Sequence, residues 1–452
     1  MRTIIDDWRH RPTHAKVWSL ALPMIASNLT VPLVALTDAT VAGHLAHANQ
    51  LAAVAIGSIV YQVPVWAFAF LRMGTVGFTA QAAGRNDGDR MRGILVQALV
   101  LAMTLAATSI ALALPLLGPV MELMRPTAEL NDLARGYLHV RGLGLPAALG
   151  NYALMGWFLG AQNARVPMRI LIVTNLVNIG LNLLFVLGFG WGVPGIALAS
   201  VCGEWIGFAS GLACIAAQLR SRPGRLHPHQ LRRWSSWRGL LGVNRDILVR
   251  SLALQGVFFG VTVLGARLGD TVVAANTLLL NGLLLSAYGL DGLANAVEAL
   301  AGYALGARNP GELRRALVVA GGWSLIGSIL FAVLFAFGGR AFVNVQSSIE
   351  TVRQTAYIYL PYLAVLPVLA VWAYLLDGLF IGAARAREMR DAMLASSLVF
   401  ALMAWCLRNL GNHGLWLAFL AFTVVRAVLM AAMAWQISRR GGWRGVEPDP
   451  AE

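Results

Sequence analysis

Long apolar stretches alternate along the whole chain with short clusters of Gly, Pro, Asn and Arg. Most of the stretches are at least as long as the roughly 20 apolar residues that cross a bilayer as a helix. We count twelve of them, at about residues 17 to 42, 50 to 83, 93 to 121, 130 to 160, 168 to 188, 193 to 219, 240 to 266, 271 to 306, 315 to 339, 352 to 382, 391 to 409 and 414 to 437. The pattern predicts an all-α polytopic membrane protein with twelve transmembrane helices, several of them tilted or bent.

The composition excludes a soluble domain. Of the 452 residues, 58% are hydrophobic and only 12% are charged, about half the charged fraction of an ordinary soluble domain. Residues 1 to 16 are charged and lead into the first apolar stretch without a cleavage site typical of signal peptides, so they predict a cytoplasmic leader.

The net charge of +14 could indicate a nucleic-acid partner, so its distribution matters. One set of connections, together with both termini, holds 25 of the 35 basic residues, seven of them between Arg220 and Arg245, and the alternate connections hold 6. By the positive-inside rule this predicts that both termini are cytoplasmic. The charge therefore indicates orientation in the bilayer rather than binding to nucleic acid.

Two motifs occur twice at nearly the same spacing. Residues 85–89 with Arg92 recur as residues 308–312 with Arg315, and seven positions between Tyr152 and Arg165 recur between Tyr374 and Arg387, at offsets of 223 and 222. Half the chain holds six spans, so both copies enter the membrane from the same face. We expect two parallel six-helix lobes related by a pseudo-two-fold axis along the membrane normal, with a binding cavity between them. The predicted divisions are an N-terminal lobe at 1–219, a basic linker at 220–239, a C-terminal lobe at 240–438 and a tail at 439–452.

Polar residues inside the spans are the best pointers to function, because a lipid-facing polar group is costly. Asp38 lies late in the first span, and Asn175, Asn178 and Asn182 form a carboxamide stripe on one face of the fifth span. Asp38 could be a solvated helix end, and the stripe could be packing between helices. At the repeat offset, however, Asp38 corresponds to Val261 and Asn178 to Phe400, so the polar set belongs to one lobe only. We expect it to bind a proton or a hard cation such as Na⁺.

The eighth span carries a second polar stripe, which should line water or pair with buried arginines. Its members are Asn281, Tyr288, Asp291, Asn295 and Glu298. The candidate charge partners for Asp291 and Glu298 are the basic residues left inside spans, namely Arg72, Arg141, Arg250 and Arg426. Such pairing would make these acids structural, and Glu204 and Asp377 could likewise be ion-paired structural acids.

Motifs for other chemistry are missing from the sequence. The eight histidines show no HExxH arrangement, the three cysteines show no metal or redox spacing, and there is no P-loop or GxSxG motif. We therefore expect no enzyme, no cofactor and no metal site, and an ion gradient as the energy source.

Several segments resemble the multidrug and toxic compound extrusion family. They are Thr37-Asp38 with the following 41–45, residues 80–84 at the end of the second span, and residues 156–161; residues 250–255 and 288–292, continuing to Glu298, are similar to the DNA-damage-inducible protein F branch of that family. Together they cover essentially the whole chain in order and spacing.

The resemblance implies a multidrug efflux transporter that exchanges inward H⁺ or Na⁺ for organic, often cationic, drug-like compounds. The coupling aspartate of the family falls on Asp38, its fifth-span asparagine on Asn178 and its sixth-span hydroxyl on Ser200. Many relatives have an aspartate where this chain has Asn182. Because one carboxylate is thereby lost, we expect H⁺ rather than Na⁺ as the coupling ion.

The resemblance also implies a cavity with loose specificity, to which we assign Tyr61, Asn151 and Met155 beside the polar residues above. We expect a monomer in a bacterial inner membrane, with the lipid bilayer and small drug-like molecules as its partners. A flippase for lipid-linked saccharides, with an arginine-lined cavity in the same fold, is the alternative. A membrane enzyme or a channel is a third class.

Overall fold

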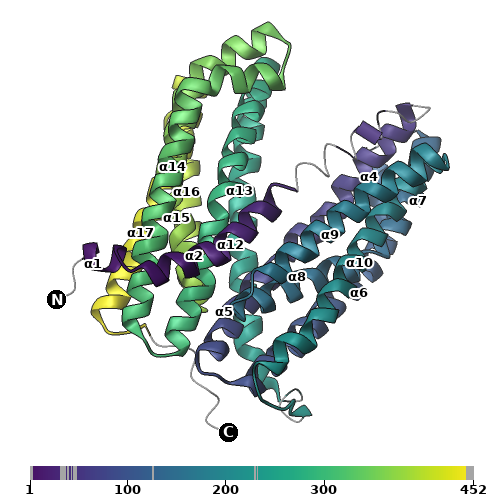
Figure 1. Ribbon diagram of the computed structural model, residues 1–452. Helices are drawn as coiled ribbons and strands as arrows, with labels where there is room; N and C mark the ends of the chain where they lie inside the picture. Colours follow the sequence, from purple (N-terminus) through teal and green to yellow (C-terminus); the bar gives the residue numbers. More distant parts are fainter. Residues whose placement is uncertain are drawn as a thin grey trace. The chain divides into compact units, whose positions relative to one another are not determined.

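The computed structural model describes residues 4–30, 37, 40–41, 43, 48–124, 127–228, 231 and 233–443, and these residues form helices joined by short turns (Figure 1). The helices are α1 Ile4–Trp8, α2 Arg11–Asn28, α4 Ala48–Ala67, α5 Phe70–Gly84, α6 Gly88–Met124, α7 Ala128–Gly142, α8 Leu145–Gly160, α9 Arg165–Asn182, the π-helix η1 Leu183–Gly188, α10 Gly192–Arg220, α12 Trp234–Arg267, α13 Asp270–Gly306, α14 Pro310–Gln346, α15 Glu350–Gly382, α16 Ala386–Cys406, the 3₁₀-helix η2 Arg408–Leu410 and α17 Asn412–Arg439. The predicted all-α class is confirmed.

Ten helical segments in the described part of the chain are long and apolar enough to cross a bilayer, one of them made of α4 with α5 and another of α9 with η1, and they coincide with ten of the twelve predicted stretches. The longest, such as α13 with 37 residues, would extend over about 55 Å at 1.5 Å per residue, which exceeds the bilayer core. Of the other two stretches, 17 to 42 lies partly outside the described residues, and 130 to 160 is divided between α7 and α8. The chain is a multi-pass membrane protein, and the count of twelve stays a prediction.

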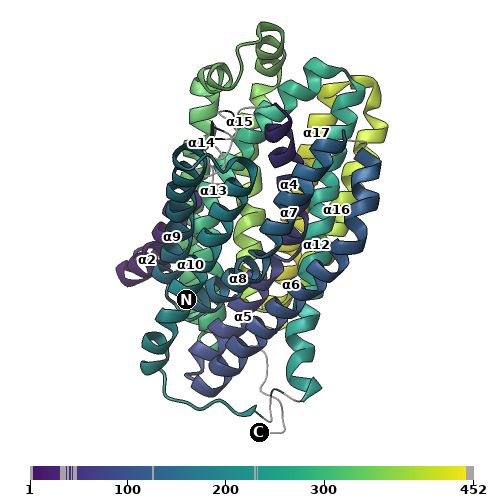
Figure 2. The same ribbon diagram turned by 90° about the vertical axis from the view of Figure 1, so that its right-hand side faces the viewer.

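The chain forms two compact units by internal contacts. We call Ala26–Arg238 the N-terminal unit and Met1–Ile25 with Gly239–Glu452 the C-terminal unit. In Figures 1 and 2 each unit is a bundle of long helices packed side by side. The first residues join the C-terminal unit through contacts with α14: Arg314 Nε lies 2.8 Å from an Asp7 carboxylate oxygen, and Trp323 Nε1 donates to His14 Nδ1 at 3.0 Å. The divisions that the sequence repeat predicts at 219 and 240 stay predictions.

The core of each unit lies around helices that are buried on nearly all sides. Helices α5 and α8 fill this role in the N-terminal unit, and α15 with the second half of α13 does so in the C-terminal unit. Their sequences are mostly small or apolar, with a few buried polar residues such as Asn151, Glu298 and Asp377. Close approach depends on glycine: a Cβ added to Gly156 would lie 2.4 Å from the Arg72 carbonyl oxygen, and one added to Gly378 would lie 2.5 Å from that of Ala294.

Local structure repeats at the spacing at which the sequence motifs recur. Gly156 and Gly378 are 222 residues apart, and so are the residues that they contact, Arg72 and Ala294. The turns that follow α5 and α13 both contain a left-handed residue, Asn86 at φ 58° and Arg308 at φ 52°. The turns after α8 and α15 do the same with Gln162 at φ 66° and Ala384 at φ 55°. The two halves thus share their local backbone geometry, and the predicted axis relating them stays a prediction.

Candidate functional site

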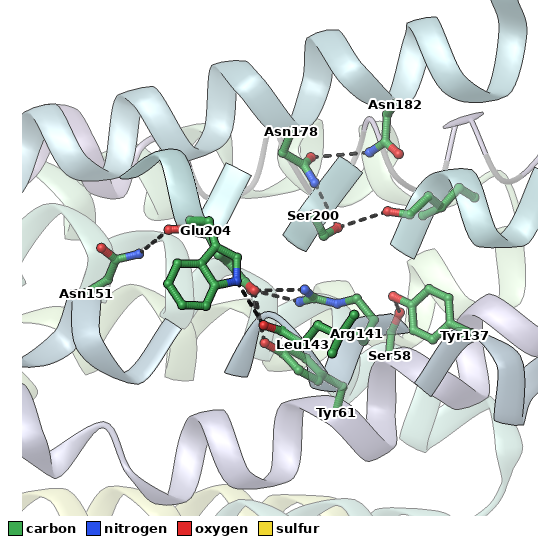
Figure 3. A network of polar contacts seen from close by, with 12 residues as sticks. Ser58, Tyr61, Tyr137, Arg141, Leu143, Asn151, Asn178, Asn182, Ser200 and Glu204 are labelled. Atoms are coloured by element: carbon green, nitrogen blue, oxygen red, sulfur yellow. Dashed lines mark hydrogen bonds and ion pairs between the residues drawn. The ribbon is translucent and has the colours of Figure 1, made fainter. Parts of the chain in front are cut away.

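Three of the four predicted coupling residues lie together in the N-terminal unit (Figure 3). The Asn178 amide donates to Ser200 Oγ at 2.9 Å, and Asn182 Nδ2 donates to Asn178 Oδ1 at 3.3 Å. Ser200 in turn donates to the Ile196 carbonyl at 3.2 Å. We call Asn178, Asn182 and Ser200 the carboxamide cluster; all three side chains are buried. The fourth predicted coupling residue, Asp38, lies outside the described residues.

Close packing of α10 against α9 brings the carboxamide cluster together. A Cβ on Gly203 would lie 2.7 Å from the Thr174 carbonyl oxygen and 3.3 Å from Asn178 Cβ, and one on Gly207 would lie 2.0 Å from Thr174 Oγ1. Only glycine allows the helices to approach this closely, and small residues are typical of close contacts between membrane helices. Directly after Asn182 the backbone widens into the π-helix η1, a local irregularity that is frequent at functional sites.

Glu204, one helical turn beyond Ser200 on α10, is the centre of a second buried group. Arg141 Nη1 and Nη2 each donate to one Glu204 carboxylate oxygen at 3.0 Å, which is a bidentate ion pair. The Tyr61 hydroxyl lies 3.2 Å from both of these oxygens. The Arg141 guanidinium also lies 3.7 Å from the centroid of the Tyr61 ring, within the range of a cation–π interaction. We call Tyr61, Arg141 and Glu204 the ion-pair cluster.

The ion-pair cluster lies at a break in a predicted span. Arg141 belongs to the last turn of α7, and Gly144 is the N-cap of α8. A cation at a helix C-terminus and an anion at a helix N-terminus are both favoured by the helix dipole. A Cβ on Gly144 would lie 2.1 Å from Glu204 Oε2, so the break leaves room for the carboxylate. Trp205 Nε1 donates to the Leu143 carbonyl at 2.9 Å.

The other predicted cavity residues of this unit lie close to the two clusters in sequence or in space. Asn151 Nδ2 donates to the Glu204 carbonyl oxygen at 3.0 Å. Asn175 Nδ2 donates to Thr30 Oγ1 at 2.6 Å. Met155 is buried in α8. Tyr61 and Asn151 are therefore bound to one residue, Glu204, which the sequence suggested only as a structural acid.

In the C-terminal unit the buried charges centre on Asp377. Its Oδ2 accepts from Arg250 Nη2 at 2.8 Å and also from Arg426 Nη2. Arg250 is attracted electrostatically by Asp291 as well. On α13, Asn295 and Glu298 are buried, and Tyr288 and Asp291 are half-buried.

Three of the four arginines proposed as partners for Asp291 and Glu298, namely Arg141, Arg250 and Arg426, donate hydrogen bonds to other carboxylates. Arg141 pairs with Glu204 and Arg250 with Asp377, each within its own unit. Arg72 lies on α5, where its backbone packs against Gly156. The sequence signal for Glu204 and Asp377 was present, because each acid interrupts an apolar span. Among the described residues, no three His, Cys, Asp or Glu side chains come together as a metal site.

A bundle of long apolar helices with buried polar clusters defines an integral membrane protein of the transporter type. The family model MatE matches residues 23–184 and 247–406, so the chain belongs to the MatE family.

Named relatives agree with this membership. The chain is 41% identical over 431 residues to DNA damage-inducible protein F of Escherichia coli (strain K12), a match that covers 94% of this chain and 93% of that protein. It is 26% identical to a probable multidrug resistance protein NorM of Bradyrhizobium diazoefficiens, with 93% of each chain covered.

Solved structures agree in fold. One described as the outward-facing conformation of a multidrug resistance MATE family transporter matches with a TM-score of 0.85 at 20% identity, over 96% of this chain and 97% of that one. A MATE structure described as the bent conformation matches with a TM-score of 0.86 at 19% identity, over 98% of each chain.

Proposed function

We propose that this protein is a secondary active multidrug efflux transporter that exports organic, often cationic, compounds in exchange for inward H⁺ by alternating access of two lobes. The observation that carries the proposal is the carboxamide cluster, which places three buried hydrogen-bonding side chains in an apolar unit. Family membership and the naming of relatives as multidrug resistance proteins support it.

In the proposed cycle, Asp38 is ionised while the cavity is open outward. A proton then binds Asp38 and weakens its polar contacts with Asn178 and Asn182, and substrate is released. Opening inward delivers the proton to the cytoplasm. The cluster suits this role because its amide and hydroxyl groups can satisfy a carboxylate and can regroup among themselves when the carboxylate is neutral.

The choice of H⁺ rests on the charge of the site. Na⁺ is a hard cation that takes oxygen ligands, and a strong site for it is helped by more than one carboxylate. The carboxamide cluster contributes oxygen atoms but no charge, since position 182 is an asparagine. With Asp38 as the one acid assigned to the site, proton binding is the simpler chemistry.

We further propose that the protein lies in a bacterial inner membrane with both termini cytoplasmic, on the strength of the charge distribution. The basic linker contacts the start of α6 on the same predicted face. There, Arg92 donates to the Arg222 carbonyl at 3.0 Å, and His227 Nε2 lies 2.8 Å from Asp89 Oδ2.

The flippase alternative gains no support from three of the four arginines inside the spans. A flippase for lipid-linked saccharides would need arginines available to bind phosphate. Arg141, Arg250 and Arg426 are each paired with a carboxylate of their own unit.

Efflux from proteoliposomes under an imposed pH gradient and under an imposed Na⁺ gradient, measured side by side, tests the proposal. We expect the pH gradient to drive efflux and the Na⁺ gradient not to. Asp38→Asn should abolish pH-driven efflux, and Asp132→Asn, the same change at an exposed acid on α7, should leave it intact. Full efflux by Asp38→Asn would overturn the assignment, and efflux driven by Na⁺ alone would overturn the choice of ion.

A further inference from the structure

Residues of the two N-terminal clusters correspond to a hydrophobic core in the second half of the chain. The register of the repeat is fixed by the helix bounds, since Ala48 and Asp270 begin α4 and α13, and Ala128 and Glu350 begin α7 and α15, both 222 residues apart. At this offset three polar residues have buried apolar counterparts, which belong to one cluster of the C-terminal unit: Tyr61 corresponds to Leu283, Arg141 to Leu363 and Asn178 to Phe400.

The fold therefore does not require polar side chains at these three positions, whereas Glu204 corresponds to Arg426, a buried charged residue that binds Asp377. Desolvating two charges can cost more than their mutual attraction returns, and well-packed apolar residues are often at least as stabilising as a buried ion pair. The C-terminal unit has that apolar packing, with Leu283 4% exposed and Leu363 fully buried. Positions 61 and 141 can thus be filled by apolar side chains in this fold, and pairing an arginine at position 141 with Glu204 is specific to the N-terminal unit.

The ion-pair cluster is linked to the carboxamide cluster through α10. Ser200 and Glu204 are four residues apart and thus lie on one side of the helix. Gly203, between them, packs against Thr174 and Asn178 of α9. Glu204 binds Arg141 at the end of α7, and Trp205 binds the carbonyl of Leu143 at the break before α8. Helix α10 is held between α9 and this break.

We propose that Arg141, Glu204 and Tyr61 are positioning residues for the coupling site. The ion pair fixes the rotation and axial position of α10 against the α7–α8 break, and thereby holds Ser200 Oγ at hydrogen-bond distance from the Asn178 amide. Without the pair, α10 remains packed in the bundle but is free to shift against α9. This role rests on the proposed coupling function of the carboxamide cluster.

The double variant Arg141→Met with Glu204→Gln separates positioning from simple stability. It removes both charges and keeps most of the side-chain volume, so the unfolding temperature should remain near that of the wild type. Efflux under a saturating pH gradient should nevertheless fall about tenfold, because small displacements of a functional group have large effects. The external pH at half-maximal efflux should shift by about one unit.

The matched control is Glu350→Gln with Arg353→Met. It makes the same chemical changes at a more exposed ion pair on α15, where Arg353 Nη1 lies 3.8 Å from Glu350 Oε2. This control should leave both the efflux rate and the external pH at half-maximal efflux unchanged. A folded Arg141→Met, Glu204→Gln protein with wild-type efflux and pH profile would overturn the positioning role.

Hydrogen exchange gives a readout that does not depend on transport. Amides of residues 174–182 and 196–205 should exchange faster in the double variant than in the wild type, and amides of α13 should not change. Unchanged exchange in those two segments would refute the positioning role even if efflux falls. A wild type without gradient-driven efflux would instead refute the proposed function.

Discussion

The two units use the same helical frame in different ways. Residues 350–382 form one unbroken helix, α15, whereas the corresponding residues 128–160 are divided into α7 and α8. Likewise α13 runs unbroken over Asp270–Gly306, whereas residues 48–84 are divided into α4 and α5. The carboxamide cluster and the ion-pair cluster occur in the unit with the breaks, whereas the buried charges of the C-terminal unit centre on Asp377 of the unbroken α15. Around Leu283, Leu363 and Phe400 the C-terminal unit closes with apolar side chains, whereas the corresponding positions of the N-terminal unit hold Tyr61, Arg141 and Asn178.

The charged groups of the two units also differ in kind. Glu204 is neutralised by one arginine through two parallel hydrogen bonds, and a tyrosine covers the pair. Asp377 is shared by two arginines. Removal of one arginine therefore leaves Glu204 uncompensated but leaves Asp377 with a partner. This difference yields a measurable order of effects.

The largest loss of unfolding free energy should come from Arg141→Met. It leaves the Glu204 carboxylate, whose side chain is only 14% exposed, without its cation, and the loss of one partner of a buried ion pair costs about 3–5 kcal/mol. The corresponding change in the C-terminal unit, Leu363→Met, swaps two apolar side chains of similar volume and should cost less than about 1.5 kcal/mol. Unfolding of the purified proteins in detergent measures both. Equal losses of unfolding free energy for Arg141→Met and Leu363→Met would show that the N-terminal unit does not depend on a charge at this position.

A smaller loss should follow from Arg250→Met. Asp377 keeps Arg426 as its partner, so the expected cost is about 1–3 kcal/mol, the range for a lost buried hydrogen bond to a charged group. The same detergent unfolding assay applies. A loss greater than that of Arg141→Met would contradict the interpretation of Asp377 as a shared carboxylate.

The smallest difference should appear where the units are alike. Gly156→Ala and Gly378→Ala each introduce a Cβ at about the same distance from a carbonyl oxygen of the neighbouring helix. Each should destabilise its unit by about 1–3 kcal/mol through overpacking, and the two losses should agree to within about 0.5 kcal/mol. A clear disagreement would mean that the common frame is less similar than the backbone geometry indicates.

Much of the fold could be predicted from the sequence, because length and hydropathy determine which segments cross a membrane. Ten of the twelve predicted stretches coincide with long apolar helices. The contact of Asn178 with Ser200 was expected from the family resemblance, and the glycines at 203 and 207 account for it through close packing of α9 and α10.

The partners of the buried arginines could not be predicted in the same way. Arg141 and Glu204 are 63 residues apart, and their pairing depends on the rotation and depth of three separate helices. Hydrophobic periodicity determines neither the rotation of these helices nor their depth in the bundle. The break at Gly142 to Gly144 was likewise hidden within a continuous apolar stretch, since the turn there needs no polar residue. Sequence reasoning thus found the arginines and suggested that Glu204 and Asp377 are ion-paired acids, but it did not join the two sets, and the proposed pairing of Asp291 and Glu298 stays a prediction.

The central claim is that the proton that drives export binds in the N-terminal unit. It is tested most directly by proton release from the purified protein when a transported organic cation is added in weakly buffered detergent solution. The account predicts that the wild type releases protons and that Asp38→Asn releases none while remaining folded. Proton release by Asp38→Asn equal to that of the wild type would contradict it.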